Sequence, residues 1–239
     1  DRTRFVLMTH IHGQPVDVAG LRDLAEDRGF VIIEDAAASL GAEYRGGKTG
    51  RFGRIGYYSF SMYKNLNTLY GGMVGADDDE TLAAIDVVMD GLDLRDPPTA
   101  ELMKRLSFAL ATSVLTHPAP FSVSGYWGIR LLSAVAGDLF NRALVTLDDA
   151  PPPAMLPPEY RERMSGLQAA IGLAALTRLD LDNMIRMRNG AVLDRALAGV
   201  PWLTMPARVD WGKDIVLNYV VQVPRRDEVI TRLLVRGVD

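Results

Sequence analysis

Two residues in the first third of the sequence have types and places that could carry out chemistry together. Asp35 ends an apolar run, FVIIED, and is followed by a row of small residues. Lys64 follows a second run, YYSFS. A carboxylate beside small residues suits the close approach of a flat ligand, and a lysine in apolar surroundings can act as a nucleophile or a base. At the carboxyl ends of two neighbouring parallel strands, the acid and the amine would meet at one edge of a sheet.

Each of these residues also has a simpler interpretation. Asp35 could cap the turn or helix that follows it, and a lysine at a strand end usually faces solvent. The pair, rather than either residue alone, favours a catalytic site. Ser59 could offer a hydroxyl group to a phosphate, although it and its neighbours Ser61, Asn65 and Asn67 are also residue types that turns favour.

The histidines offer a different chemistry. His10 and His12 are expected on one face of a strand, a pattern that binds metals in several hydrolases. The third histidine is the distant His117, and the sequence shows no obvious acidic partner. We therefore favour one packed histidine and one solvated histidine over a metal site. The acidic run at 76–80 is interpreted as the first turn of a helix rather than a site for a divalent cation.

The elements that must position these residues alternate along the first ninety positions. Continuous apolar runs predict buried strands at 4–11, 30–37, 54–61 and 71–77. Helical spacing predicts helices at 17–29, ending at a glycine, and at 78–92. This alternation predicts an α/β fold with a mostly parallel central sheet covered on both faces.

Composition excludes several classes of protein. The chain has 239 residues, a formal net charge of −4 and no cysteine. The charge gives no basis for a nucleic-acid partner. The lack of cysteine excludes a disulfide scaffold and a thiolate metal site, and it fits a cytoplasmic location.

The remainder of the chain is expected to form three further parts. Residues 91–157 hold an apolar insert and a proline-rich linker, and within them 106–129 lacks Asp, Glu, Lys and Arg. Prolines and glycines in this stretch argue against a membrane span and favour an apolar hairpin on the protein, on a partner or on a membrane surface.

Residues 158–200 are predicted to be helical. Residues 201–239 are predicted to begin a smaller α+β domain with a strand at 214–223 and a helix at 224–237. We take 1–90 as part of a large domain, and we expect both ends of the sequence to be cuts through a longer protein.

Two stretches then resemble one family. The run THIHGQPVDVAGLRDLAEDRGFVIIEDAAASLGAEYRGGKTGRFGRIGYYSFSMYKNL and the later RMSGLQAAIGLAALTRLD are similar to the DegT/DnrJ/EryC1/StrS aminotransferases. The resemblance covers residues 1 to about 90 and about 160 to the end, and leaves the apolar insert outside. It implies the type I fold of enzymes that use pyridoxal 5′-phosphate (PLP).

The resemblance also implies roles. Asp35 matches the aspartate that pairs with the pyridine nitrogen of PLP, and Lys64 matches the lysine that bonds to the cofactor. Ser59 matches a serine that binds the cofactor phosphate, and Asn65 is expected to lie at the cofactor. An ionised carboxylate beside the ring nitrogen keeps that nitrogen protonated, which makes the ring an electron sink.

Some positions depart from the family pattern. Ala38 stands where the family usually has Gln or His near the cofactor ring oxygen. Leu69 and Tyr70 replace a Gly-Glu pair after the lysine. Arg161 aligns with an asparagine that reaches the cofactor phosphate of a neighbouring subunit, and an arginine could still hold a phosphate. Gly166 replaces a common glutamate. The family's glycine-containing phosphate loop would precede residue 1.

The implied function is transamination of a nucleotide-linked keto sugar, with glutamate as the amino donor, by a homodimer. Three alternatives stay open. One is a PLP-dependent sugar dehydratase, against which Lys64 argues because that branch of the family has histidine there. The others are a non-catalytic or regulatory protein of the same fold and a metal hydrolase that uses His10 and His12.

Overall fold

The computed structural model describes residues 2–115, 117–121, 123, 127–128 and 158–236. The chain forms two compact units. The first comprises residues 1–97 and 161–222, and the second comprises 98–160 and 223–239. All the candidate site residues named above fall in the first unit. The division of this sequence into four parts stays a prediction.

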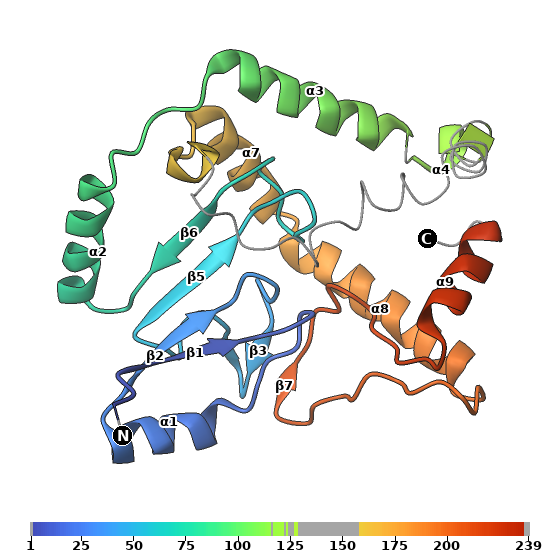
Figure 1. Cartoon of the computed structure of the whole chain (residues 1–239), viewed down its shortest axis with the longest axis horizontal. Helices are drawn as coiled ribbons and strands as arrows, with labels where there is room; N and C mark the ends of the chain where they lie inside the picture. The colour runs from blue at the N-terminus through green and yellow to red at the C-terminus, as the bar shows by residue number, and fades with distance from the viewer. Residues whose placement is uncertain (1, 116, 122, 124–126, 129–157, 237–239) are drawn as a thin grey trace. The chain divides into compact units, whose positions relative to one another are not determined.

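A four-stranded sheet is the centre of the first unit (Figure 1). Its strand order is β1-β2-β5-β6, with bounds Phe5–Thr9, Val31–Asp35, Ile55–Ser59 and Gly72–Gly75. The first three strands are parallel and β6 is antiparallel to β5. The sequence prediction of an α/β fold with a mostly parallel sheet is confirmed. Because Thr9, Asp35 and Tyr57 follow one another across the register, the carboxyl ends of three strands meet at one edge.

Helix α1, Val18–Arg28, covers one face of this sheet. Asp17 caps its first turn by accepting a hydrogen bond from the Ala19 amide, and Gly29 ends it in the left-handed conformation with φ 70°. The helix lies where its apolar spacing and its terminal glycine predicted it. The core beneath it is a cluster of Met8, Val18, Ile32 and Tyr44.

The opposite face of strand β1 is open in the described part of the chain. Phe5 is 63% exposed and Leu7 is 57% exposed, whereas Met8 between helix and sheet is buried. The prediction that this strand is buried on both faces is therefore wrong for these residues. Alternate side chains point to opposite faces of a strand, and α1 packs against the face that carries Met8.

A small second sheet ties the late part of the first unit to the early part. Its order is β4-β3-β7, with bounds Gly47–Lys48, Glu43–Tyr44 and Gly212–Lys213. The strand predicted at 214–223 is wrong, because the chain after β7 is irregular and Val216 has φ 47°. The alternating pattern that suggested a strand comes instead from Ile215 and Leu217, which are buried against Ala42 while their amides donate to the carbonyls of residues 12 and 13.

The remaining helices of the first unit are α2 (Asp79–Gly91), α7 (Gly166–Leu176) and α8 (Leu179–Leu197). The acidic run at 76–80 does begin a helix, since Asp78 caps α2 through the Thr81 amide. The predicted helical stretch at 158–200 is interrupted. A short 3-10 turn, η2, spans Pro158–Arg161. Ser165 then starts α7 with a reciprocal capping box, so Met164 lies before the helix.

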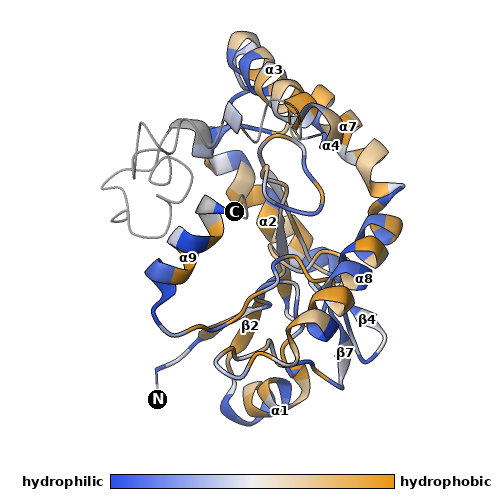
Figure 2. Ribbon diagram, turned by 90° about the vertical axis from the view of Figure 1, so that its right-hand side faces the viewer, coloured by the Kyte–Doolittle hydropathy of each residue, from blue (hydrophilic) through white to orange (hydrophobic). Residues whose placement is uncertain are grey.

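The second unit contains helices α3 (Thr99–Leu115), α4 (Pro118–Pro120) and α9 (Arg226–Val235). The first part of the predicted apolar hairpin, 106–115, is therefore the end of one helix, in which hydrophobic and hydrophilic residues alternate (Figure 2). The proline-rich linker and much of 116–129 lie outside the described residues. Among the helices described, none combines the length and the apolar character that crossing a bilayer requires.

Gly56 in β5 offers a test of how tightly the site strands are packed. A Cβ atom at this position would lie 2.0 Å from the carbonyl oxygen of Gly50, a backbone atom that cannot yield easily. We expect Gly56→Ala to lower the free energy of unfolding by about 3 kcal/mol, as overpacking does. Urea denaturation of the full-length protein measures this. The matched control is Gly75→Ala at the paired position in β6, where a Cβ atom meets nothing within 4 Å. Equal effects of the two variants would contradict the expectation.

Candidate active site

Asp35 is the last residue of β2 and its carboxylate is held at the edge of the sheet. Its Oδ1 accepts a hydrogen bond of 2.9 Å from the amide of Ala37, and its carbonyl oxygen accepts one of 3.0 Å from the amide of His10. The carboxylate thus does form the local turn contact of the simpler interpretation. The same contact leaves its other oxygen available to a second donor.

Tyr57 is a second group beside this carboxylate, and the sequence interpretation did not include it. It lies opposite Asp35 in the parallel register of β2 and β5, so the two side chains share a face. Burial and the hydrogen bond of the phenol with the Asp35 carboxylate raise the pKa of Tyr57 to about 12. The signal available in the sequence was its place in the next parallel strand, two residues before that strand ends.

Ser59 lies two residues beyond Tyr57, at the end of β5, and therefore on the same face. Its Oγ lies 3.4 Å from the Oγ of Ser61 and accepts a weak hydrogen bond of 3.5 Å from the Ser61 amide. The structure thus brings Asp35, Tyr57 and Ser59 to one edge and one face of the sheet. Phosphate binding by Ser59 stays a prediction.

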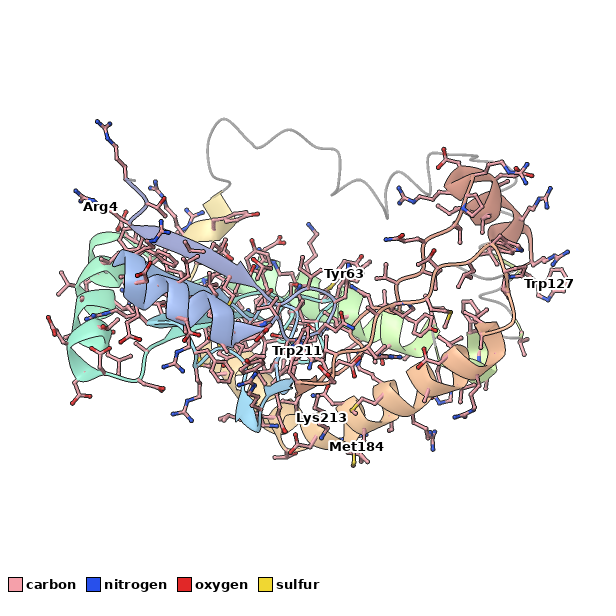
Figure 3. The ribbon with its side chains drawn as sticks, turned by 90° about the horizontal axis from the view of Figure 1, so that it is seen from below. Arg4, Tyr63, Trp127, Met184, Trp211 and Lys213 are labelled. Carbon is pink, nitrogen blue, oxygen red and sulfur yellow. The ribbon has the colours of Figure 1, made fainter. Side chains whose placement is uncertain are left out.

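Lys64 does not lie at a strand end, contrary to the sequence interpretation. Strand β5 ends at Ser59, and Lys64 lies in the 60–71 loop. The backbone amide of Lys64 donates a hydrogen bond of 3.0 Å to the carbonyl of Ser61. The side chain is half-buried, and its neighbour Tyr63, labelled in Figure 3, is 68% exposed. Among the residues that the structure describes, none forms a hydrogen bond or an ion pair with the Lys64 amine, and that includes Asp35. The meeting of Lys64 and Asp35 on one ligand stays a prediction.

The loop that carries Lys64 is anchored by the residue next to it. Asn65 Nδ2 donates 2.7 Å to the carbonyl of Leu40 and 3.0 Å to Oδ1 of Asn183 in α8. Asn183 Nδ2 also donates to the Leu40 carbonyl, at 3.2 Å. Both amide hydrogens of Asn65 are therefore used within the protein, so the predicted cofactor contact of Asn65 could involve its oxygen alone.

A second anchor comes from the conspicuous LQAAIG run. Gln168 is 3% exposed, and its Nε2 donates to the carbonyls of Thr68 and Tyr70, at 3.3 and 2.9 Å. Gly172, one turn later, lets α7 approach closely, since a Cβ atom there would lie 2.9 Å from the methyl group of Thr68. The run thus holds the end of the Lys64 loop.

The departure at Leu69 has a structural explanation. Leu69 has φ 73°, a left-handed backbone conformation that glycine adopts readily and leucine does not. This position is the one at which the resemblance leads one to expect glycine. The side chain of Leu69 is buried, and its amide donates a hydrogen bond of 2.7 Å to Oδ1 of Asn67. The burial and this hydrogen bond together stabilise the strained backbone conformation.

A buried hydrogen-bonded network that includes a His–Glu pair lies behind Asp35, on the other face of β2. His10 and Glu34 are both fully buried, and His10 Nε2 lies 2.6 Å from Glu34 Oε1. Because the Val16 amide donates to His10 Nδ1, the proton of a neutral His10 is on Nε2 and is donated to Glu34. The amides of Gly50, Phe52 and Gly53 also donate to the Glu34 carboxylate.

Glu34 is the acidic partner of His10 that the sequence analysis did not find. Burial opposes ionisation of Glu34, but the hydrogen bonds from His10 and from the three amides outweigh it and lower its pKa. The network joins the ends of β1 and β2 to the turn before β5. It therefore supports the three strand ends at which the candidate site lies.

His12 does not share a strand face with His10. β1 ends at Thr9, and His12 is exposed in a turn with φ 59°. One packed and one solvated histidine was the preferred interpretation, and it is confirmed. Within the described ranges no group of three potential metal ligands occurs, and the metal-hydrolase alternative therefore has no support in this part of the chain.

The last two predicted residues lie in different settings. Ala38 is partly buried against the cluster of Ala42, Ile215 and Leu217, where a larger side chain would have to displace apolar neighbours. Arg161 is exposed at the end of η2, and its carbonyl oxygen accepts from the Arg95 amide at 2.9 Å. A role of either residue at a cofactor stays a prediction.

The donor set fits PLP. The Asp35 carboxylate, which lies beside the Ala37 amide and the Tyr57 phenol, suits a protonated ring nitrogen. The hydroxyl of Ser59, on the same face of the sheet, suits a phosphate. The half-buried Lys64 amine has no competing partner among the described residues. These three groups are the ones that a PLP enzyme needs to hold the ring and to bond with its aldehyde.

Several relatives of this chain have the names of transaminases or synthases of amino sugars. It is 27% identical over 238 residues to the dTDP-3-amino-3,4,6-trideoxy-alpha-D-glucose transaminase of Streptomyces venezuelae, covering 100% of this chain and 48% of the relative. It is 34% identical over 245 residues to the GDP-perosamine synthase of Caulobacter vibrioides, covering 100% of this chain and 51% of the relative. The chain thus spans about half the length of the curated relatives it matches.

Solved structures give the same fold. The crystal structure of S. venezuelae DesV matches with a TM-score of 0.63 and 26% identity, covering 100% of this chain and 49% of that one. The E. coli GDP-4-keto-6-deoxy-D-mannose-3-dehydratase with bound hydrated PLP matches with a TM-score of 0.66 and 15% identity, covering 100% of this chain and 53% of that one. At this identity the match is one of fold alone. The fold is that of the type I PLP enzymes. The model of the DegT/DnrJ/EryC1/StrS aminotransferase family matches residues 1–93 and 153–239, and this chain belongs to that family.

Proposed function

We propose that the full-length protein is a PLP-dependent aminotransferase that moves an amino group from glutamate to a nucleotide-linked keto sugar. Membership of the family and the names of its relatives support the reaction and the substrate class. The observation that carries the proposal is the unpartnered amine of Lys64, among the described residues, in a loop anchored from two helices. A lysine that served only as a surface charge would need no such anchoring.

Three side chains would perform the work at the cofactor. Bound PLP supplies an electron sink that stabilises negative charge on the substrate carbon. The Asp35 carboxylate would hold the proton of the ring nitrogen, and the Ser59 hydroxyl would donate to the phosphate. Nζ of Lys64 would hold the cofactor through its aldehyde group, and the free amine would accept a proton from the substrate and give it back.

The proposal includes an assembly and a location. By resemblance to the family we expect a cytoplasmic homodimer, with Arg161 reaching toward the partner's cofactor phosphate. The exposed apolar side chains at the end of α3, among them Phe108, Leu110 and Val114, motivate contact of 106–129 with a membrane surface or a lipid-linked substrate. Neither idea is needed for the chemistry at Lys64.

Chemical trapping tests the proposal directly. The full-length protein is mixed with PLP, reduced with borohydride so that the bond between lysine and cofactor becomes permanent, digested and analysed by mass spectrometry. We expect the cofactor on Lys64 and not on the exposed Lys213. Labelling of surface lysines without labelling of Lys64 would contradict the proposal. Product analysis with a keto sugar nucleotide then separates an amino sugar from the deoxy sugar that a dehydratase would give.

A further inference from the structure

Tyr57 stands in a fixed relation to Asp35 that the proposed chemistry has not used. The two residues are paired across β2 and β5, and the amide of Ala36 donates 3.0 Å to the carbonyl of Tyr57. On its other side Tyr57 is paired with Val74 of β6. The backbone of Tyr57 is therefore held between two strands, next to the residue that carries the carboxylate.

Two hydrogen-bond donors consequently lie beside the Asp35 carboxylate. One oxygen accepts from the Ala37 amide, and the phenol of Tyr57 adds a second donor. Because burial and the carboxylate raise the pKa of the phenol to about 12, Tyr57 keeps its proton at neutral pH. It can therefore act toward Asp35 as a donor throughout the range in which enzymes work.

We propose that Tyr57 is a positioning residue for Asp35, which orients the carboxylate toward the ring nitrogen of PLP and weakens its hold on the proton of that nitrogen. This inference rests on the proposed function. A carboxylate that already accepts two hydrogen bonds has less electron density to share with a third donor, so the ring proton would be held less tightly than by a free aspartate. No covalent bond is made or broken by Tyr57, and its own proton stays on the phenol oxygen.

The first experiment tests the pair without PLP. Tyrosinate absorbance is titrated at high pH in the full-length protein, in Tyr57→Phe and in Asp35→Asn. Tyr57→Phe should remove one late-titrating phenol, and Asp35→Asn should lower the pKa of that phenol from about 12 toward the ordinary 10.0. Tyr58→Phe is the matched control, because its phenol donates to the Thr49 carbonyl, at 2.7 Å, instead of to Asp35. An unchanged titration in Asp35→Asn would overturn the inference.

The second experiment tests the consequence for PLP. We expect Tyr57→Phe to weaken PLP binding about tenfold, because the Asp35 carboxylate is no longer oriented before the cofactor binds, whereas Tyr58→Phe should change it less than about twofold. With PLP labelled with nitrogen-15 in the ring, the chemical shift in Tyr57→Phe should move toward that of the protonated ring. A merely structural role would leave that shift unchanged.

The outcomes distinguish this inference from the proposed function. If the parent protein binds PLP and Tyr57→Phe binds it equally well with the same nitrogen shift, the inference is wrong and the proposed function stands. If the parent protein binds no PLP, the proposed function and the inference are both wrong, although the phenol titration still reports on the contact between Tyr57 and Asp35.

Discussion

Replacement of Lys64 by alanine is expected to abolish transamination by the full-length protein. The alanine has no amine to bond with PLP or to move a proton between substrate and cofactor, and the proton transfer alone contributes about a hundredfold to ten-thousandfold to the rate. We therefore expect kcat to fall by at least about a thousandfold, below the detection limit of most assays. Product formation from a keto sugar nucleotide and glutamate measures it, with the visible absorbance of the bound cofactor as a second signal.

Two comparisons make the Lys64 result specific. Lys213→Ala removes an exposed amine in β7, outside the candidate site, and should leave kcat within about twofold of the parent protein. Thermal unfolding of Lys64→Ala without PLP should match that of the parent protein, because the described residues give the Lys64 amine no partner to lose. Retention of more than a few per cent of kcat by a folded Lys64→Ala protein would refute the assignment.

The second large effect is expected at Glu34, where the substitution acts on stability. Glu34→Ala removes the acceptor of four hydrogen bonds and leaves His10 and the amides of Gly50, Phe52 and Gly53 buried without it. Breaking a buried charged network in this way costs about 3–5 kcal/mol of unfolding free energy. Urea denaturation measures the loss. Glu26→Ala on the exposed side of α1 is the control and should stay within about 0.5 kcal/mol.

Glu34 also gives the stability of the first unit a defined dependence on acid. Its pKa is lowered in the folded protein from the ordinary 4.5, while in the unfolded chain it returns to that value. The folded state therefore binds fewer protons, and the stabilisation is fully present above pH 4.5 and is lost as the pH falls through the lowered pKa. In Glu34→Gln this part of the acid dependence should disappear. A Glu34→Gln protein whose stability fell with pH as steeply as that of the parent protein would contradict this account.

The sequence predicted the strands and helices of the first ninety residues well because each has its own local signal. Helix α1 has a capping aspartate, apolar spacing and a terminal glycine, and the strands are continuous apolar runs. The 214–223 strand failed for a reason that no local pattern reveals. Ile215 and Leu217 alternate as in a strand, but their partners, at residues 12 and 13, are two hundred positions away.

The candidate site was predictable in part for the same reason. Asp35 and Ser59 lie at strand ends, which the apolar runs locate. Tyr57 and Glu34 escaped notice because their roles depend on pairing between strands: Tyr57 matters through its register with Asp35, and Glu34 through the face of β2 opposite Asp35. The position of Lys64 was misjudged because YYSFS continues the strand pattern beyond Ser59, where the backbone has already turned.

The link between Asn65 and Asn183 has a consequence for how the protein is made. These residues are 118 positions apart, and the hydrogen bond between them fixes the residue next to Lys64. A ribosome must therefore synthesise the chain as far as Asn183, near the start of α8, before the Lys64 loop can acquire its final shape. During translation Asp35 can be positioned early, by the neighbouring strands, whereas Lys64 is positioned late. An unfinished chain would therefore present to the PLP aldehyde a Lys64 amine that is not yet held in place.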